Sequence, residues 1–365
     1  MSDGDDRGDE MALTLYVDGQ RWHSHLLRVR DAHPGIVPVL KGNGYGFGIG
    51  RLAELSAWLG VDTVAVGTYP EVAPARRGDG GAAASDDDGA FVGSVLVLTP
   101  WRPFEQAVYA DHVVHTVGRL EDLRALASRE DTPRVLLERM TSMRRHGFSA
   151  GGLREAADLL AGVAVEGVAV HLPISQTSHV AEVHRLMTDV VSAGLPTKRV
   201  YVSHLTDTEL VTLSQRYPDF ELRPRIGTEL WLGDRDALQV RATVLDTHPV
   251  ERGDGFGYRS RSIPKAGHLL IVSGGTAHGI GLEAPTGGAT LKDRAARVAK
   301  GGLDAVGFVR SPYVIDGKQR LFAEPPHMQA SMLFLPQGAP VPQVGDEVDV
   351  RVRFTATRFD ETVVA

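Results

Sequence analysis

Eight short apolar runs lie between residues 36 and 222, and segments with apolar residues at helical spacing separate most of them. Runs of this length are typical of buried strands, and their alternation with helices favours parallel βα units. Eight such units within roughly 200 residues predict a (β/α)8 barrel that ends near Gly233. The runs are Ile36–Leu40, Thr63–Val66, Ser94–Thr99, His112–Val117, Arg134–Leu137, Val163–Leu172, Arg199–Val202 and Phe220–Leu222.

The texture of the sequence changes from about Leu238 onward. Alternating apolar and polar runs, separated by glycine and proline, are typical of an all-β domain. An alternating run at Leu13–Val17 is expected to be an entry strand, which we place in the same domain ahead of the eight barrel strands. We therefore predict three regions: a disordered tail over residues 1–12, a barrel over 13–235 and a C-terminal β domain over 236–365.

Composition excludes several classes of function. The net charge of −7 gives no indication of nucleic-acid binding. The chain has no cysteine, so a metal site would need histidine and carboxylate ligands, and none is predicted. No apolar run reaches the roughly 18 residues of a membrane span. The acidic first ten residues do not resemble a secretory signal, and a cytoplasmic protein is expected. The polar segment 76–89 is expected to be a flexible surface insertion.

The first apolar run of the predicted barrel ends at a lysine. Lys41 follows Ile36–Leu40, and five glycines lie within the next ten residues. Glycine allows a close approach of backbone to a ligand. A lysine at the mouth of a buried strand loses its proton more easily than one in water, because desolvation disfavours the ammonium. A neutral amine is what Schiff-base formation with an aldehyde requires.

The string VLKGNGYGFG resembles the cofactor-lysine motif of the alanine racemase family, V-K-A-N-A-Y-G-H-G. The resemblance implies that Lys41 carries pyridoxal 5′-phosphate (PLP) as a Schiff base and that Tyr45 binds its phosphate. It also implies the same order of domains, a barrel followed by a β domain. Two alanines of the motif are replaced by glycine here, and a histidine is replaced by Phe47.

Two further segments match the family at strand ends. The segment after Leu137 resembles D-T-G-M-x-R-x-G, which implies that Arg145 lies near the cofactor and the substrate carboxylate. Glu138 stands where some members have a carbamylated lysine that orients this arginine, and it would supply a similar negative charge. The resemblance implies that His171, at the end of the sixth run, stacks on the pyridine ring.

Two segments are similar to the phosphate-binding parts of the family. In the segment 203–208, Thr208 takes the place of a serine that binds phosphate, although Thr206 or Asp207 would serve equally well as an ordinary helix N-cap. In the segment 223–233, Gly227 anchors the match, so that Arg225 corresponds to the arginine that donates to the pyridine nitrogen. Gly227 and Thr228 are expected to offer backbone N–H groups to the phosphate.

The main departure from the family concerns its second catalytic base. The family delivers a tyrosine from the partner subunit, but Thr276 occupies its position here. His278 follows and is our candidate for the second base, offered across a homodimer interface. Met328 corresponds to a methionine whose backbone meets the substrate carboxylate.

The resemblance implies a PLP-dependent amino-acid racemase in which Lys41 is the base on one face of the substrate. The lost tyrosine leaves open another PLP reaction on the same scaffold, namely that of an aldolase, a decarboxylase or a lyase. A non-catalytic PLP-binding protein is the third alternative. The sequence does not identify the amino acid.

Overall fold

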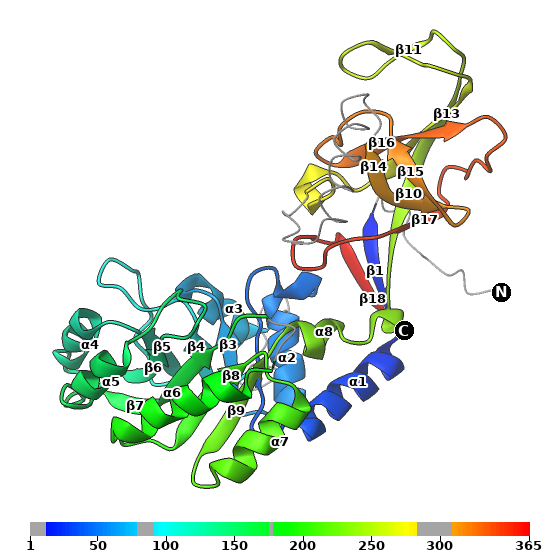
Figure 1. Cartoon of the computed structure of the whole chain (residues 1–365). Helices are drawn as coiled ribbons and strands as arrows, with labels where there is room; N and C mark the ends of the chain where they lie inside the picture. The colour runs from blue at the N-terminus through cyan, green and yellow to red at the C-terminus, as the bar shows by residue number, and fades with distance from the viewer. Residues whose placement is uncertain (1–11, 79–90, 175–177, 283–308) are drawn as a thin grey trace, which may run out of the picture. The chain divides into compact units, whose positions relative to one another are not determined.

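The computed structural model describes residues 12–78, 91–174, 178–282 and 309–365. The chain divides into two compact units, one formed by His23–Asp234 and the other by the segments before and after it. Each unit is described by itself. We call them the barrel unit and the β unit (Figure 1).

The barrel unit is built on eight parallel strands. The strands from β3 to β9 lie side by side in chain order, and β2 lies beside β9. A parallel bridge between Val39 and Ala65 joins the two ends of this sheet and closes the ring. The strands are β2 (Val37–Pro38), β3 (Thr63–Val66), β4 (Ser94–Val97), β5 (Val113–Val117), β6 (Arg134–Arg139), β7 (Ala164–His171), β8 (Arg199–Ser203) and β9 (Glu221–Ile226).

Helices cover the outside of this barrel (Figure 1). Local sequence fixes where some of them begin. Thr206 and Glu209 form a reciprocal capping box at the start of α7, and the Ser149 hydroxyl accepts a hydrogen bond from the Gly152 amide at the start of α5. The helices are α1 (Gly19–Ala32), α2 (Ile49–Trp58), α3 (Val72–Arg77), α4 (Leu120–Ala127), α5 (Ala150–Ala157), α6 (Val180–Ser192), α7 (Asp207–Arg216) and α8 (Thr228–Leu232), with short 3-10 turns η1 (Gly44–Gly46) and η2 (Tyr69–Glu71).

A cluster of buried side chains fills the barrel, and its members come from strands around the ring. Because side chains of a strand alternate between its two faces, one face of each strand can contribute to this interior and the other to the contact with the helices. The cluster consists of Val37, Val39, Ala65, Leu96, Val114, Leu136, Ala169 and Tyr201.

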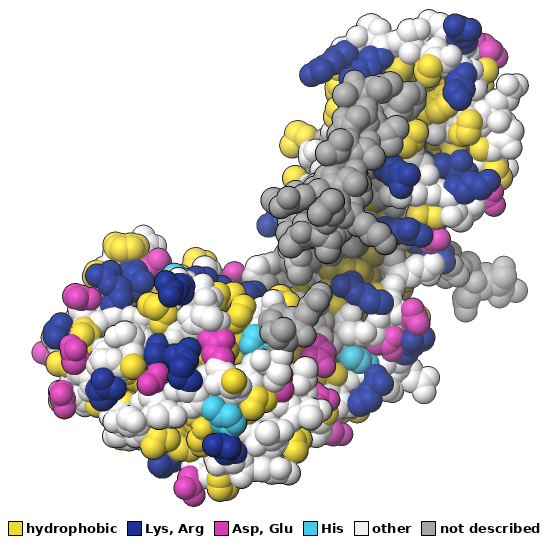
Figure 2. Space-filling view, in the orientation of Figure 1, with side chains coloured by type: hydrophobic (Ala, Val, Ile, Leu, Met, Phe, Trp, Pro, Cys, Tyr) yellow, Lys and Arg dark blue, Asp and Glu magenta, His cyan; other side chains and the backbone are white. Residues whose placement is uncertain are grey.

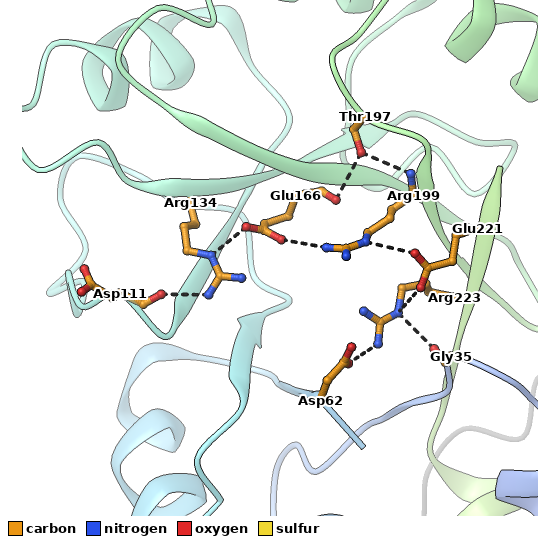
Figure 3. A network of polar contacts seen from close by, with 9 residues as sticks. All are labelled: Gly35, Asp62, Asp111, Arg134, Glu166, Thr197, Arg199, Glu221 and Arg223. Carbon is orange, nitrogen blue, oxygen red and sulfur yellow. Dashed lines mark hydrogen bonds and ion pairs between the residues drawn. The ribbon is translucent and has the colours of Figure 1, made fainter. Parts of the chain in front are cut away.

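Charged side chains join the N-terminal ends of the barrel strands (Figure 3). Glu166 accepts from Arg134 at 2.7 Å and lies 3.4 Å from Arg199, which also pairs with Glu221 at 3.1 Å. Arg223 continues the network to Asp62 and to Glu221. Ion pairs of alternating sign thus link β6, β7, β8 and β9 at this end of the barrel, where residues of such barrels contribute to stability and not to catalysis.

The β unit is an antiparallel barrel with two additional strands. The order β13-β16-β15-β14-β17-β10 closes through a second pairing of β10 with β13. β10 has 13 residues, enough to pair with both β17 and β13, and a bulge between Val244 and Asp246 bends it. The strands are β10 (Leu238–Val250), β13 (Gly267–Ser273), β14 (Arg310–Ile315), β15 (Lys318–Phe322), β16 (Ala330–Pro336) and β17 (Glu347–Val350), with a small hairpin of β11 (Gly255–Phe256) and β12 (Arg261–Ser262). The predicted fold class, a (β/α)8 barrel with a C-terminal all-β domain, is confirmed.

The first strand does not lie where the sequence led us to expect it. β1 (Leu13–Val17) pairs with β10 and with β18 (Glu361–Val364), so it belongs to the β unit and not to the barrel predicted over 13–235. An alternating pattern specifies that a segment is a strand with one buried face, but it does not specify the sheet.

Two predicted regions fall mostly outside the described residues. The tail predicted over 1–12 is described only at Ala12, which is buried, and the insertion predicted over 76–89 only at residues 76–78. Arg76 and Arg77 belong to the last turn of α3 and not to an insertion.

No helix of the described residues is long and apolar enough to cross a bilayer. On the face of the barrel unit drawn in Figure 2, basic side chains lie interspersed with acidic and uncharged ones.

The barrel wall has a position where only glycine fits, which generates a prediction on stability. A Cβ at Gly167 in β7 would lie 2.7 Å from the Arg199 carbonyl oxygen and 2.8 Å from the Tyr201 ring. Gly167→Ala should therefore lower the free energy of unfolding by about 1–3 kcal/mol, measured by urea denaturation. Gly151→Ala in α5 is the matched control, because its Cβ would meet nothing closer than 3.9 Å. The control should be neutral or stabilising by up to about 1 kcal/mol. An equal loss in both variants would contradict the packing argument.

Candidate active site

Lys41 stands at the C-terminal end of β2, where active sites of such barrels are built. The backbone just before it is fixed, because the Leu40 amide donates to the Ala65 carbonyl at 2.8 Å. The side chain reaches solvent at this mouth of the barrel. Desolvation by the surrounding protein, followed by the charges of Arg145 and Arg225, lowers the pKa of Lys41, and the carboxylate of Glu71 acts in the opposite direction.

Glu71 holds the backbone around this lysine and was not among the predicted site residues. Its two carboxylate oxygens accept from the Gly42 amide at 3.1 Å and from the Gly67 amide at 2.5 Å. The ends of β2 and β3 are thereby tied together next to Lys41. The sequence did contain a signal, because Thr68 and Glu71 form the capping box of η2.

The glycine-rich loop after Lys41 turns Tyr45 into the protein. Tyr45 is buried and has a left-handed φ of 56°, which is uncommon for a non-glycine residue. Gly44, with φ of 60°, makes the tight turn possible, since a Cβ there would lie 2.7 Å from the Ile49 amide nitrogen. The loop sequence is therefore needed for the placement of the tyrosine.

Tyr45 meets the start of α8. Its hydroxyl forms a hydrogen bond with Thr228, and a Cβ at Gly227 would lie 2.0 Å from the same oxygen. Burial raises the pKa of Tyr45 to about 12, so the phenol keeps its proton at neutral pH and can donate it in a hydrogen bond. The structure thus brings three predicted phosphate-binding residues together: Tyr45, Gly227 and Thr228.

Arg225 and Glu138 are buried within the barrel unit with unsatisfied polar atoms. Arg225 lies in β9 and Glu138 in β6, and Arg225 donates one long hydrogen bond of 3.4 Å to the Val170 carbonyl. Arg225 Nε and Glu138 Oε2 have no hydrogen-bond partner. Burial lowers the pKa of Arg225 to about 10 and raises the pKa of Glu138, against their mutual attraction. Buried donors and acceptors left in this state are suited to a ligand.

Arg145 lies in the loop between β6 and α5 and is exposed. Its positive charge contributes to lowering the pKa values of Lys41 and His171 and opposes the raised pKa of Glu138. Arg145 is therefore close enough to the barrel mouth to act on its charged groups, and its predicted role beside the cofactor and the substrate carboxylate stays a prediction. The side chain is free to approach an anionic ligand there.

His171 ends β7 and is held by its neighbours. Its Nδ1 lies 2.8 Å from the Ser203 hydroxyl, and its ring centroid lies 5.3 Å from that of His204. His204 has a left-handed φ of 59° and bonds through Nδ1 to the Leu172 carbonyl at 2.7 Å. Burial, and next Arg225, lowers the pKa of His171 to about 3. The ring is therefore neutral at physiological pH.

Thr208 lies in the first turn of α7 and is exposed. The capping role that the sequence left open between Thr206 and Asp207 falls to Thr206, whose hydroxyl accepts from the Glu209 amide at 3.3 Å. Asp207 instead points to His33, at 3.0 Å. The threonine predicted to bind phosphate is thus not engaged in capping.

The two remaining predicted site residues, His278 and Met328, lie in the β unit. His278 is buried, and both its ring nitrogens are engaged: Nδ1 accepts from the Gly275 amide at 3.1 Å and Nε2 lies 3.0 Å from Asp360. His278 as a second base stays a prediction, and in this structure it would have to exchange its contact with Asp360 for one with the substrate. The Met328 side chain is exposed, and its carbonyl accepts from the Ala277 amide at 3.0 Å, beside Thr276.

The barrel mouth therefore combines a lysine of lowered pKa, two arginines and a buried carboxylate. A neutral phenol and a neutral imidazole complete the set. Such a set can bind an anionic group, hold an aromatic ring beside His171, and exchange a proton at the lysine amine.

The sequence of the barrel unit, which carries this site, is similar to that of known proteins. Residues 17–224 match the family model for the N-terminal domain of alanine racemase. The alanine racemase of Nitratidesulfovibrio vulgaris (strain Miyazaki F) is 27% identical over 274 residues, which cover 68% of this chain and 71% of that protein.

Solved structures share the fold over nearly the whole length. The alanine racemase from Bartonella henselae, with covalently bound pyridoxal phosphate, superimposes with a TM-score of 0.69 at 15% identity, over 98% of this chain and 100% of that chain. The enzyme from Bacillus anthracis, with bound L-Ala-P, gives a TM-score of 0.67 at 19% identity, over 97% and 88%.

The low pKa of His171 predicts an acid-sensitive contribution to stability. Below about pH 6.5 the unfolded chain protonates this histidine, whereas the folded chain does so only near pH 3, so stability falls as the pH falls through this window. Between pH 7 and pH 5, this group should lower the unfolding free energy of the cofactor-free protein by up to about 2 kcal/mol. His171→Gln should remove that difference in urea titrations at the two pH values. Ser203→Ala, which deletes only the hydrogen bond, should keep it.

Proposed function

We propose that this chain, which belongs to the alanine racemase family, is a PLP-dependent amino-acid racemase. The observation that carries the proposal is Lys41, a lysine of lowered pKa at the end of a barrel strand, between two arginine charges. The string around it matches the cofactor-lysine motif, and the family model covers the barrel that presents it. The membership in the family supports the cofactor class; the assignment of residues is our own.

The residues at the barrel mouth fit PLP. The unpartnered Nε of buried Arg225 is a donor that a pyridine nitrogen would satisfy. At the other end, Tyr45 and Thr228 converge where Gly227 leaves no room for a side chain, which suits a phosphate group. Lys41 would hold the aldehyde carbon, and Thr208 is the further phosphate ligand in this proposal.

PLP, when bound, supplies the electron sink that makes the α-proton of an amino acid acidic. The chain's own residues provide the rest. The lowered pKa of Lys41 increases the fraction of neutral amine, so that Nζ can accept the proton from one face of the substrate. Arg225, charged at neutral pH, donates without giving up its proton and so keeps the sink weak, which favours simple proton exchange.

Arg145 would bind the substrate carboxylate in this proposal. It is exposed at the same mouth, and a guanidinium binds a carboxylate through two parallel hydrogen bonds. Buried Glu138 would hold the arginine in position by charge. The backbone of Met328 is the second proposed contact to the carboxylate, delivered by a partner subunit.

Racemisation also requires a proton donor on the opposite face of the substrate. A cytoplasmic homodimer with shared sites is part of the proposal, and the donor would come from the β unit of the partner. His278 could serve only by giving up its contact with Asp360, and a threonine hydroxyl such as that of Thr276 is a poor base at neutral pH.

The lack of an unengaged proton donor among Thr276 and His278 favours a second candidate function. With Thr276 in place of a phenol and His278 bonded on both nitrogens, proton exchange on one face only would be the outcome. A PLP-dependent lyase, decarboxylase or aldolase needs no second base of this kind. Such an enzyme would use the same Lys41, Arg225 and Tyr45.

The cofactor assignment predicts a covalent link at Lys41. Borohydride treatment of PLP-loaded protein should fix the cofactor on this side chain, as detected by peptide mass spectrometry. Lys41→Ala should lose both the adduct and the absorbance band of bound PLP, because the substitution removes the amine that the aldehyde would bind. Lys265→Ala, which changes an exposed lysine of the β unit, should keep both. An adduct that persists in Lys41→Ala would refute the assignment.

The reaction class is tested by incubating the loaded enzyme with single enantiomers of amino acids in deuterated water. A racemase incorporates deuterium at the α-carbon and converts each enantiomer into the other. Chiral chromatography and mass spectrometry read both quantities. Release of a fragment or of carbon dioxide would establish the second candidate. Retained PLP without turnover of any of the twenty amino acids would indicate a non-catalytic PLP-binding protein.

A further inference from the structure

Three metal-ligating side chains converge on the outside of the barrel unit, from parts of the chain far apart in sequence. His33 follows α1, Asp207 begins α7, and Glu229 lies in α8 (Figure 1). One ligand atom from each residue lies within 4.8 Å of those of the other two. None of the three belongs to the set around Lys41 described above.

The hydrogen bonds of His33 define which of its nitrogens faces the carboxylates. Nδ1 lies 2.8 Å from the Val29 carbonyl, which can only accept, so Nδ1 carries a proton. In a neutral imidazole, Nε2 then presents a lone pair, and it lies 3.0 Å from an oxygen of Asp207, which is also an acceptor. A lone pair and two carboxylates whose ligand atoms lie within 4.8 Å of one another are stabilised by a positive charge between them or on the ring.

The same hydrogen bond is typical of a metal-ligating histidine. Such a residue usually donates its second ring N–H to a backbone carbonyl or carboxylate, which fixes the tautomer and the orientation of the ring. His33 is 4% exposed, so its ring is held in place before any ion arrives. Asp207 and Glu229 are exposed and give the site access to solvent.

We propose that His33, Asp207 and Glu229 bind one divalent transition-metal cation of the zinc class. Ligand atoms around such an ion at roughly 2.0–2.2 Å lie about 3.4 Å apart. His33 Nε2 and Asp207 Oδ1, at 3.0 Å, are already near this spacing, and the Glu229 oxygen lies within 4.8 Å of both, so only small side-chain shifts are needed. The exposed carboxylates can make these shifts, and water would complete the coordination. One imidazole with two carboxylates favours zinc over magnesium, which prefers oxygen ligands alone.

The ion would tie together two elements that begin at the barrel mouth. Asp207 precedes Thr208, and Glu229 follows Thr228. A bound cation would therefore restrain the first turns of α7 and α8 against the end of α1. Binding itself does not depend on the proposed racemase activity, and its test requires neither PLP nor turnover.

The test is a calorimetric titration of ZnCl₂ into the tag-free, chelator-treated full chain, with a thermal melt in parallel. Stoichiometric binding of one ion and a rise in the melting temperature are expected, because a ligand that binds only the folded state stabilises it. Glu229→Gln and Asp207→Asn should each weaken zinc binding by at least about tenfold, since even an outer-shell partner is worth this much. MgCl₂ should give a much weaker signal.

The control is His248→Ala. His248 lies 3.3 Å from Asp246 in the β unit and forms an exposed pair of the same type without a third ligand. This variant should bind zinc as the parent does. The proposal is overturned if no heat of binding is observed, since His33 would then be an imidazolium paired with Asp207. It is also overturned if Glu229→Gln binds as tightly as the parent, or if His248→Ala loses the signal.

Discussion

The structure of the candidate site depends on how positive charge is held at one end of the barrel. Lys41, Arg145 and Arg225 act on one another electrostatically, and Glu138 is the buried carboxylate that faces them. Mutual repulsion and burial keep the ammonium of Lys41 and the guanidinium of Arg225 less favourable than they are in water. Such a cluster of positive charges lowers the stability of the ligand-free protein, and an anionic ligand would reduce the repulsion.

At the N-terminal ends of the barrel strands, positive side chains are paired with carboxylates. There Arg134, Arg199 and Arg223 alternate with carboxylates, and each guanidinium has a direct partner (Figure 3). These three guanidinium groups are thus already neutralised by carboxylates of the protein. The difference between the two ends agrees with the general placement of stability at the N-terminal face of such barrels and of chemistry at the C-terminal face.

Much of the architecture could be predicted from the sequence because the barrel strands are continuous apolar runs. The run Thr63–Val66 coincides with β3, and Arg199–Val202 falls within β8. The grouping of Tyr45 with Thr228 could also be expected, but only from the resemblance, since no spacing rule links residues so far apart.

What the sequence missed are contacts between distant positions. The role of Glu71 depends on two amides at the ends of different strands, and the engagement of His278 depends on Asp360, 82 residues later. The same holds for His33, Asp207 and Glu229, which carry no motif. A side chain's type and its neighbours in sequence do not reveal which backbone or carboxylate the fold will place against it.

The pairing of β1 with strands far along the chain delays its burial during synthesis. Leu13 donates its amide to Asp360, 347 residues further along, and β1 lies between β10 and β18. During translation, β1 has no partner until the ribosome has passed the whole barrel and β10 is made, and its second edge stays uncovered until β18 is made. The barrel can therefore form first on the emerging chain while the apolar strand β1 is still unpaired. In that state, chaperone binding or aggregation competes with completion of the second sheet.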